Sequence, residues 1–518
     1  MWLDRAGVVL EGACELAAAD AVADVWRATV ARLSAALGWP PVCCTIRQRD
    51  GRMMLAFTAP TDQLFTATEV NEWAWLQSTR VAGLGGGPSA LAPGDLPRDE
   101  EATLVQLRVL AAIERHAPAP DLAISAPRDQ MVALVTGSNG KTTTTRLIAA
   151  MTAAHGWSTG WSCTDGVFIN GQPAERGDWS GPAGAQRAVR DPSVRAAVLE
   201  TARGGMLRRG LGVLDATVAV VTNVEADHFG EYGVTSLADL AEVKLVVAKG
   251  LRPDGVLILN ADDATLRSAA LPHVRTIWFS ARGDTGITQD RVVRAWQEDG
   301  HLWLGARARR RDLGRVRAMP ITAGGTATYN VENALAAALA AALLGVAPAT
   351  IAQVLETFGA LPTDNPGRLE RYTIDGTHVL VDYAHNPAGL SALLGVARGL
   401  SPVRLLLLLG QAGNRADDAL ADLARTAWAA RPDRIIIKEL DSYRRGREAG
   451  EVTHVLATAL RSFGVAESQM EFVPEEVEAV DAALRWARPG DVLVLPVHAL
   501  DARERVSALL EARSKATR

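Results

Sequence analysis

The stretch MVALVT (Met131–Thr136), followed by GSNGKTT (Gly137–Thr143), decides how the middle of this chain folds. The first six residues are typical of a buried strand, and the residues from Thr144 to His155 are typical of a helix. Glycines and a lysine stand between them. A glycine-rich turn between a strand and a helix exposes backbone N–H groups at the helix N-terminus, which is a favourable place for a phosphate group.

This loop predicts a binding site for the phosphates of ATP. Its members are Gly137, Ser138, Asn139, Gly140, Lys141, Thr142 and Thr143. In such a loop the lysine lies beside the β- and γ-phosphates, and the hydroxyl group of the following threonine binds Mg²⁺. The spacing between the glycines is shorter than in the general pattern G-x-x-x-x-G-K-[ST], and a chance turn before a helix is the alternative interpretation. The loop predicts ATP without saying what ATP is used for.

Apolar runs alternate with helical stretches along the rest of the chain and predict an α/β protein. In the middle of the chain these runs are RAAVLET (195–201), ATVAVVTN (216–223) and GVLILN (255–260). From Gly367 onward the pattern repeats with HVLVDYA, RLLLLLG, RIIIKEL and VLVLPV. Runs as apolar as these suit a parallel sheet that is buried on both faces.

We therefore predict a central P-loop parallel-sheet domain at residues 129–364 and a C-terminal Rossmann-like domain at residues 365–518. A small N-terminal α+β domain precedes them at residues 1–128. It contains one predicted strand, Arg52–Thr58, several helical stretches and a linker rich in structure breakers, His116–Gln130. A chain of 518 residues is long enough for roughly three domains of about 100–200 residues each.

The composition excludes several classes of function. The formal net charge is only -5, so the chain lacks the basic footprint expected for nucleic-acid binding or for a charged membrane surface. The uncharged run Ala334–Leu355 is alanine-rich and interrupted by Gly345 and Pro348, which favours two buried helices over a membrane span. The four cysteines form no C-x-x-C pair, and the N-terminus lacks a basic signal region. We expect a cytoplasmic protein and leave a homodimer open.

Three residues near strand ends are candidate catalytic groups. Glu200 ends the second predicted strand, at the edge where ligands of open α/β sheets gather, and could bind Mg²⁺. His228 follows the next strand, and Lys244 lies on the helical stretch after it. Each has an ordinary alternative: a strand-end glutamate, a solvated histidine and a solvated helix lysine.

Two asparagines open the alanine-rich helix. Asn330 suits the N-cap of that helix as well as it suits a ligand. Asn333 is unusual on so apolar a helix unless its amide meets a partner, either the edge of an adenine ring or the protein backbone.

These motifs together resemble the Mur-ligase superfamily from Met131 to the C-terminus. Within it, the likeness is closest to the Mur-ligase-like half of cyanophycin synthetases. The stretches that carry it are ETARGGMLRRGLG (200–212), TNVEADHFGEYG (222–233), YNVENALAAA (329–338), NPGRLE (365–370) and VDYAHNPAGL (381–390). The stretch LAFTAPTDQLFTATEVNEWAWLQ (55–77) is faintly similar to the N-terminal domain of those synthetases.

The resemblance implies an ATP-dependent ligase that joins a carboxylate, through an acyl phosphate, to an amino-acid amine. It implies that Thr142 and Glu200 bind one Mg²⁺ ion and His228 a second, which a carbamylated Lys244 helps to hold. The implied nucleotide contacts beyond the loop are Asn330, Asn333, Arg368 and Asp382. The candidate substrate contacts are Thr164, Asp165, Arg203, His385 and Asn386.

Two departures from the family pattern bear on the substrates. About 130 residues precede the P-loop, too few for the ATP-grasp module of cyanophycin synthetases. The loop GQAGNRADDAL (Gly410–Leu420) differs from the family's P-G-D-R-R pattern. The preferred prediction is a ligase for an aspartyl-type carboxylate, on a small molecule or a peptide. The alternatives are a ligase for a glutamyl or small-metabolite carboxylate, and a non-catalytic nucleotide-binding partner subunit.

Overall fold

The structure is a computed structural model of the chain and divides into two compact units. One comprises Met1–Phe279 with Leu339–Val346, and the other comprises Ser280–Ala338 with Ala347–Arg518. The described residues are 7–14, 16–49, 51–60, 63–81, 103–104, 107–108, 111, 129–226, 234–269, 271–283, 294–413 and 415–516. The breaker-rich stretch 83–97 and most of the predicted linker therefore lie outside them.

The N-terminal part of the first unit is a small three-stranded antiparallel sheet with helices. The strands follow the order β1-β3-β2, and the predicted strand Arg52–Thr58 is confirmed as β3. The bounds are β1 (Gly7–Ala13), β2 (Cys44–Arg49), α1 (Ala19–Ala36) and α2 (Leu64–Val81). Trp26 is fully buried and its indole N–H donates to Asn71 Oδ1 at 2.9 Å, so this core ties α1 to α2.

The larger sheet of the first unit contains the predicted strand Met131–Thr136 as β4. Between residues 131 and 280, its strands run in the order β11-β10-β9-β4-β8-β5-β6-β7. Their bounds are β5 (Thr159–Cys163), β6 (Gly166–Ile169), β7 (Gln172–Arg176), β8 (Ala196–Glu200), β9 (Ala216–Val221), β10 (Leu251–Asn260) and β11 (Thr276–Ser280). All neighbouring strands from β11 to β5 are parallel, whereas β5, β6 and β7 pair antiparallel. The parallel sheet is confirmed, and the antiparallel edge was not predicted.

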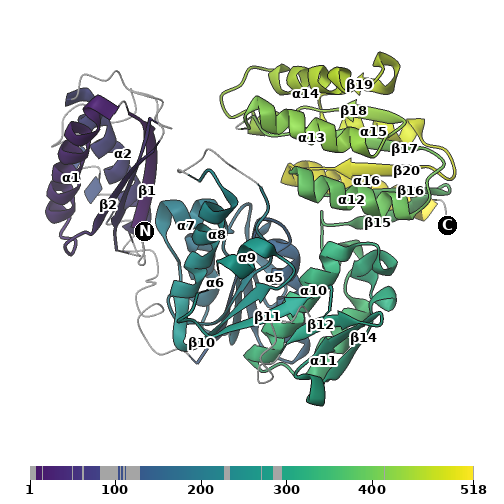
Figure 1. Ribbon diagram of the computed structural model, residues 1–518, viewed down its shortest axis with the longest axis horizontal. Helices are drawn as coiled ribbons and strands as arrows, with labels where there is room; N and C mark the ends of the chain where they lie inside the picture. Colours follow the sequence, from purple (N-terminus) through teal and green to yellow (C-terminus); the bar gives the residue numbers. More distant parts are fainter. Residues whose placement is uncertain are drawn as a thin grey trace. The chain divides into compact units, whose positions relative to one another are not determined.

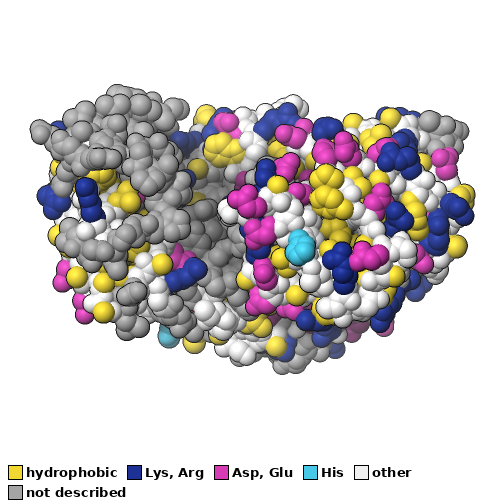
Figure 2. Space-filling view, turned by 90° about the horizontal axis from the view of Figure 1, so that it is seen from above, with side chains coloured by type: hydrophobic (Ala, Val, Ile, Leu, Met, Phe, Trp, Pro, Cys, Tyr) yellow, Lys and Arg dark blue, Asp and Glu magenta, His cyan; other side chains and the backbone are white. Residues whose placement is uncertain are grey.

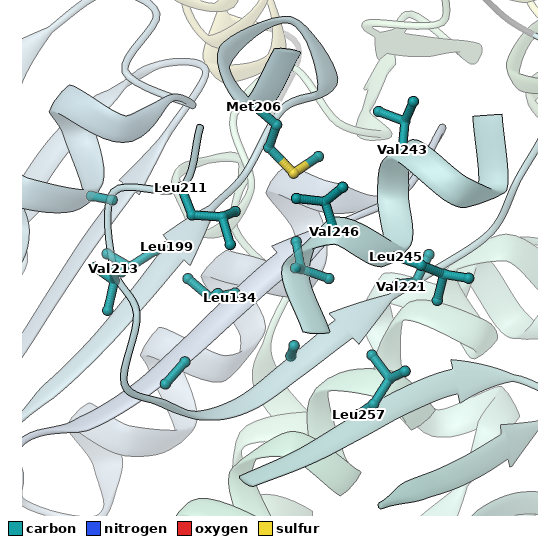
Figure 3. Close-up of a cluster of buried hydrophobic side chains, with 14 of the residues drawn as sticks. Leu134, Leu199, Met206, Leu211, Val213, Val221, Val243, Leu245, Val246 and Leu257 are labelled. Carbon is teal, nitrogen blue, oxygen red and sulfur yellow. The ribbon is translucent and has the colours of Figure 1, made fainter. Parts of the chain in front are cut away.

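One face of this sheet packs on a cluster of buried apolar side chains, shown in Figure 3. Leu134 of β4 and Leu199 of β8 meet Met206 and Val246 there. The helices of the sheet are α5 (Lys141–Ala154), α6 (Pro182–Val189), α7 (Arg203–Arg209), α8 (Leu237–Leu245) and α9 (Ala264–Ser268). Consecutive residues of β4, Val132 to Val135, are all buried, so both faces of the sheet are covered and polar side chains are restricted to the strand ends.

Residues 295–357 form antiparallel strands and two helices. The strands are β12 (Ala295–Glu298), β13 (His301–Leu304) and β14 (Arg311–Arg315). The uncharged run Ala334–Leu355 falls on two helices, α10 (Thr328–Leu344) and α11 (Pro348–Thr357), as predicted.

The C-terminal sheet follows the order β15-β16-β20-β17-β18-β19. Its strands are β15 (Glu370–Ile374), β16 (Thr377–Asp382), β17 (Leu405–Leu409), β18 (Arg434–Ile437), β19 (Met470–Phe472) and β20 (Val492–Pro496). All neighbouring strands are parallel except β15 and β16, which are antiparallel. The four predicted runs are the strands β16, β17, β18 and β20.

Helices cover both faces of the C-terminal sheet (Figure 1). They are α12 (Pro387–Gly399), α13 (Asp417–Ala429), α14 (Glu451–Ser462), α15 (Glu476–Trp486) and α16 (Leu500–Ala516). Leu407 packs in the core with α12, α13 and α14, whereas its neighbour Leu408 packs in the core with α15 and α16. Successive strand residues point to opposite faces, so this alternation confirms a sheet buried on both sides.

Among the described residues, no helix is both long and apolar enough to cross a membrane. Figure 2 shows acidic and basic side chains intermixed on the face in view, with apolar side chains between them. That distribution agrees with the small net charge.

We predict that Asp491→Asn lowers the free energy of unfolding by about 1–3 kcal/mol, the scale of leaving a buried polar group unpaired. Asp491 is buried before β20, accepts from Arg488 N at 2.7 Å and receives the side chain of Arg404. Urea denaturation measures the change. Asp422→Asn is the matched control, since Asp422 forms an exposed pair with Arg425 and should change stability by less than about 1 kcal/mol. Equal effects of the two substitutions would contradict the prediction.

Candidate active site

The phosphate loop is shaped by a close approach of two backbone segments. The helix α5 begins at Lys141, earlier than predicted, with Gly140 as its N-cap in the left-handed conformation (φ 82°). Gly137 has φ 149°, and a Cβ atom there would lie 1.8 Å from Thr222 Oγ1. Only glycine fits this position, because any side chain would displace the loop from the segment that follows β9.

Hydrogen bonds tie the loop to the residues after β9. Thr222 Oγ1 donates to Asn139 O at 2.6 Å, and Asn139 N donates to Asn223 Oδ1 at 2.9 Å. Ser138 Oγ donates to Glu225 O at 3.0 Å and accepts from Glu225 N at 2.9 Å. The side chain of Ser138 therefore holds the loop in place. The loop is thus preorganised for the phosphate group predicted to bind there.

The Lys141 side chain folds back over the loop that precedes it. Its Nζ donates to Gly137 O at 3.1 Å and to Ser138 O at 2.9 Å. The ammonium group thus lies at the loop.

A cluster of oxygen atoms lies beside the first turn of α5. Thr142 Oγ1 donates to Glu200 Oε2 at 2.8 Å, and Thr164 Oγ1 donates to Glu200 Oε1 at 3.0 Å. The two hydroxyl oxygens are 3.4 Å apart, and Glu200 is only 1% exposed. A buried carboxylate with two hydroxyl groups offers the hard oxygen ligands that suit Mg²⁺ together with phosphate oxygens. Among the described residues, no three His, Cys, Asp or Glu side chains form a metal-binding group, so this set is a mixed one.

The predicted substrate residue Asp165 has a buried ionic partner. Its Oδ2 lies 2.7 Å from Arg146 Nη2 of α5, and both side chains are buried. Burial raises the pKa of the neighbouring Cys163 thiol to about 11. The Arg146–Asp165 ion pair fixes the turn that carries Thr164 toward Glu200.

Three further predicted site residues lie between α7 and α8 or on these helices. Arg203 opens α7 and is buried. Lys244 is buried on α8, which excludes the solvated helix lysine considered above. His228 lies outside the described residues.

The two asparagines of the second unit form a pair. Asn330 lies inside α10 and not at its N-cap, so the capping interpretation is wrong. Its Nδ2 donates to Ile321 O at 2.9 Å, and Asn333 Nδ2 donates to Asn330 Oδ1 at 3.0 Å. Both side chains are buried, and these hydrogen bonds fix the orientation of both amide groups.

Asp382 and Arg368 lie at one end of the C-terminal sheet. Asp382 Oδ2 accepts from Leu369 N at 2.7 Å. Burial raises the pKa of Asp382, and the charge of Arg368 acts against that rise. The guanidinium carbon of Arg368 lies 4.2 Å from the centre of the Tyr383 ring. The structure therefore brings these two predicted residues together.

His385 and Asn386 follow in the same loop. Asn386 is buried and caps α12, since its Oδ1 accepts from Gly389 N at 2.8 Å. His385 is half-buried, and its Nδ1 lies 3.2 Å from Tyr383 O. Of the two, the histidine has the more accessible side chain.

Sequence reasoning missed two groups of residues at strand ends. Thr222 and Asn223 were noted only as part of a motif, although two polar residues directly after a buried strand indicated contact with the loop. The buried cluster of Lys438, Glu476 and His498 was also missed. Its signals were the lysine in RIIIKEL and the histidine directly after VLVLPV, each at the end of an apolar run.

Two family models match the chain. The Mur ligase middle domain matches residues 135–341, and the Mur ligase glutamate ligase domain matches residues 367–496. The chain is 30% identical over 439 residues to the UDP-N-acetylmuramoyl-L-alanyl-D-glutamate–2,6-diaminopimelate ligase of Xanthomonas campestris, covering 80% of this chain and 81% of that protein. The chain belongs to the Mur ligase family. The predicted family is thereby confirmed.

Cyanophycin synthetases match a shorter part of their own length. The protein of Trichormus variabilis is 38% identical over 372 residues, which is 70% of this chain but 40% of the relative. The Mur ligase described here thus spans about two fifths of these relatives. Among solved structures, Escherichia coli FolC in complex with ADP has a TM-score of 0.56 at 19% identity, covering 75% of this chain and 91% of that one. The likeness supports the fold.

We predict that Glu200→Gln lowers ADP formation by about a hundredfold, the scale of losing one group that stabilises transition-state charge. The amide removes the negative charge and one of the two oxygens that accept from Thr142 and Thr164. A Mg²⁺ titration of ADP formation measures the change and should show a higher half-saturating concentration. Glu175→Gln, at a half-exposed ion pair with Arg187, is the control. An unchanged Mg²⁺ dependence in Glu200→Gln would sink the assignment.

Proposed function

We propose that this Mur ligase activates a carboxylate as an acyl phosphate and couples it to the amine of an amino acid. The observation that carries the proposal is the contact of Glu200 with Thr142 and Thr164 beside the preorganised phosphate loop. A phosphate loop alone indicates a nucleotide. A buried carboxylate at its side supplies the metal ligand that phosphoryl transfer requires.

The first step transfers the γ-phosphoryl group. An oxygen of the substrate carboxylate attacks the γ-phosphorus of ATP, the bond to ADP breaks, and ADP leaves. Both reactants are negatively charged, so the step needs positive charge near the phosphates. Lys141 supplies one charge. Mg²⁺ supplies the rest when bound, and the residues that fit it are Thr142 and Glu200, with His228 and a carbamylated Lys244 as further proposed ligands.

The second step forms the amide. The amine nitrogen attacks the acyl carbon, the bond to phosphate breaks, and the amine loses a proton. Water would compete with the amine, so the step benefits from a closed site. We assign Arg368 and Asp382 to the nucleotide on the C-terminal side, and Asn330 and Asn333 to its adenine. Thr164, Asp165, Arg203, His385 and Asn386 remain our candidates for substrate contact, and Thr164 also contacts Glu200 directly.

The proposed carboxylate is of the aspartyl type. The similarity to cyanophycin synthetases supports this choice, since the identity of 34–38% extends over most of the present chain. The changed loop Gly410–Leu420 favours the second candidate, a glutamyl or small-metabolite carboxylate. A non-catalytic partner subunit is disfavoured, because Lys141, Thr142 and Glu200 are all present. The four cysteines, none of which forms a disulfide, and the proposed use of ATP favour a cytoplasmic setting.

We predict that ADP is released from Mg-ATP only when a specific acidic acceptor and a specific amino acid are both present. The measurement is ADP release across a panel of aspartyl and glutamyl peptides, small carboxylates and amino acids, with mass spectrometry of the products. The product should be lighter than the sum of its two substrates by one water.

Two control substitutions test whether the measured ADP release comes from this protein and not from a contaminating ATPase. Lys141→Ala should lose activity by about a hundredfold or more, because it removes a charge from the phosphates. Lys249→Ala, at an exposed position in the same domain, should retain it. If tight ATP binding occurs without turnover for any pair, the ligase proposal fails and the partner-subunit alternative gains support.

A further inference from the structure

A buried cluster of charged residues lies at the carboxyl end of the C-terminal sheet. Lys438 follows β18, His498 follows β20, and Glu476 opens α15. Lys438 is 0% exposed, and the other two are buried. No step of the proposed reaction uses these three residues. A buried lysine is costly unless it is paired, so the cluster requires an explanation.

The contacts of the cluster fix the protonation of His498. Lys438 Nζ donates to Glu476 Oε1 and lies 3.1 Å from His498 Nδ1. An ammonium group has donors only, so Nδ1 must accept. Burial and the nearby Lys438 charge lower the pKa of His498 to about 4. His498 is therefore neutral near pH 7, with its proton on Nε2.

Glu476 also accepts hydrogen bonds from the backbone at His498 and Ala499. Its Oε1 accepts from His498 N and its Oε2 from Ala499 N, both at 2.9 Å. Burial alone would raise the pKa of Glu476, but Lys438 and the His498 side chain outweigh it and hold that pKa well below its usual range. Burial lowers the pKa of Lys438, and the Glu476 carboxylate acts against that lowering. The same carboxylate fixes the backbone that carries His498.

The cluster holds the loop that contains His385. His498 Nε2 lies 3.2 Å from Ala384 O, to which it donates, and Gln411 Nε2 donates to His385 O. The Tyr383 ring lies 5.3 Å from the ring of His385 and 5.5 Å from that of His498. Two consecutive carbonyl groups of the loop are thus held by side chains from other strand ends.

The same reasoning gives the tautomer of His385. A carbonyl oxygen only accepts, so the contact from His385 Nδ1 to Tyr383 O places the proton on Nδ1. In the neutral ring, Nε2 is then the basic nitrogen, at the opposite edge from the backbone contact.

We propose that Lys438, Glu476 and His498 are positioning residues that hold the loop 382–386 so that His385 directs Nε2 toward the substrates. The proposal rests on the proposed ligase function for its substrates, but the geometry it predicts can be tested without turnover. The three residues touch no substrate themselves. They act through the carbonyl of Ala384 and through the Tyr383 ring, which His498 meets edge-on.

The kinetic test compares two substitutions at one position. Gln can replace the donor at Nε2, whereas Leu cannot. His498→Leu should lower kcat on the order of tenfold to a hundredfold, because a small displacement of a positioned group is costly. The KM for ATP should change little, and His498→Gln should recover most of kcat. Asp491→Asn, buried at the other end of β20, is the control and should match wild-type kcat per folded molecule. A loss in His498→Leu no larger than in Asp491→Asn, or no recovery with Gln, would overturn the proposal.

The spectroscopic test uses ¹⁵N-histidine-labelled protein at pH 7 and needs no substrate. His498 should be neutral with the proton on Nε2, and His385 should carry its proton on Nδ1. Lys438→Met should shift the His385 signal, and Asp491→Asn should leave it in place. A charged His498, the opposite tautomer, or a His385 signal unmoved by Lys438→Met would refute the proposed positioning role. Absence of turnover for every substrate pair, with these signals as expected, would instead count against the proposed function.

Discussion

The backbone of Gly137 packs against Thr222 so closely that no side chain fits between them, and the geometry of the phosphate loop follows from this contact. The loop cannot extend freely from β4, because it must lie on the residues after β9, the neighbouring parallel strand. Hydrogen bonds from Asn139 and Ser138 then complete the attachment. As a result, α5 starts at a defined place and its first turn carries Thr142 to Glu200 at the end of β8.

In the C-terminal domain, too, the ends of buried parallel strands fix where polar side chains lie. Its central strands are buried on both faces by helices, so polar side chains have room only where the strands end. Asp382, Gln411, Lys438 and His498 each follow or end a strand of that sheet, and they contact one another or the same loop. Two sheets of different sequence thus arrive at the same arrangement for one topological reason: parallel strands direct their carboxyl ends to one edge.

Much of this could be predicted from sequence because the signals are local. The runs MVALVT and RLLLLLG are apolar and short, and they became β4 and β17 with bounds almost as expected. The strand β6 was missed because it has only four residues, and β7 was missed because its polar and exposed residues carry no strong pattern. Asn330 was open to two interpretations. The helix start at Thr328, two residues earlier, excluded the capping role.

The sequence by itself determined the α/β class, the phosphate loop and the membership of the Mur ligase family, because each depends on residues that are neighbours in the chain. Only the tertiary structure decided the partners of the candidate residues. Thr164 meets Glu200, Asp165 meets Arg146, and Lys438 meets His498, across separations of 36, 19 and 60 positions. Hydrogen bonds and ion pairs depend on distances of a few ångströms, and folding alone sets those distances between segments far apart in sequence.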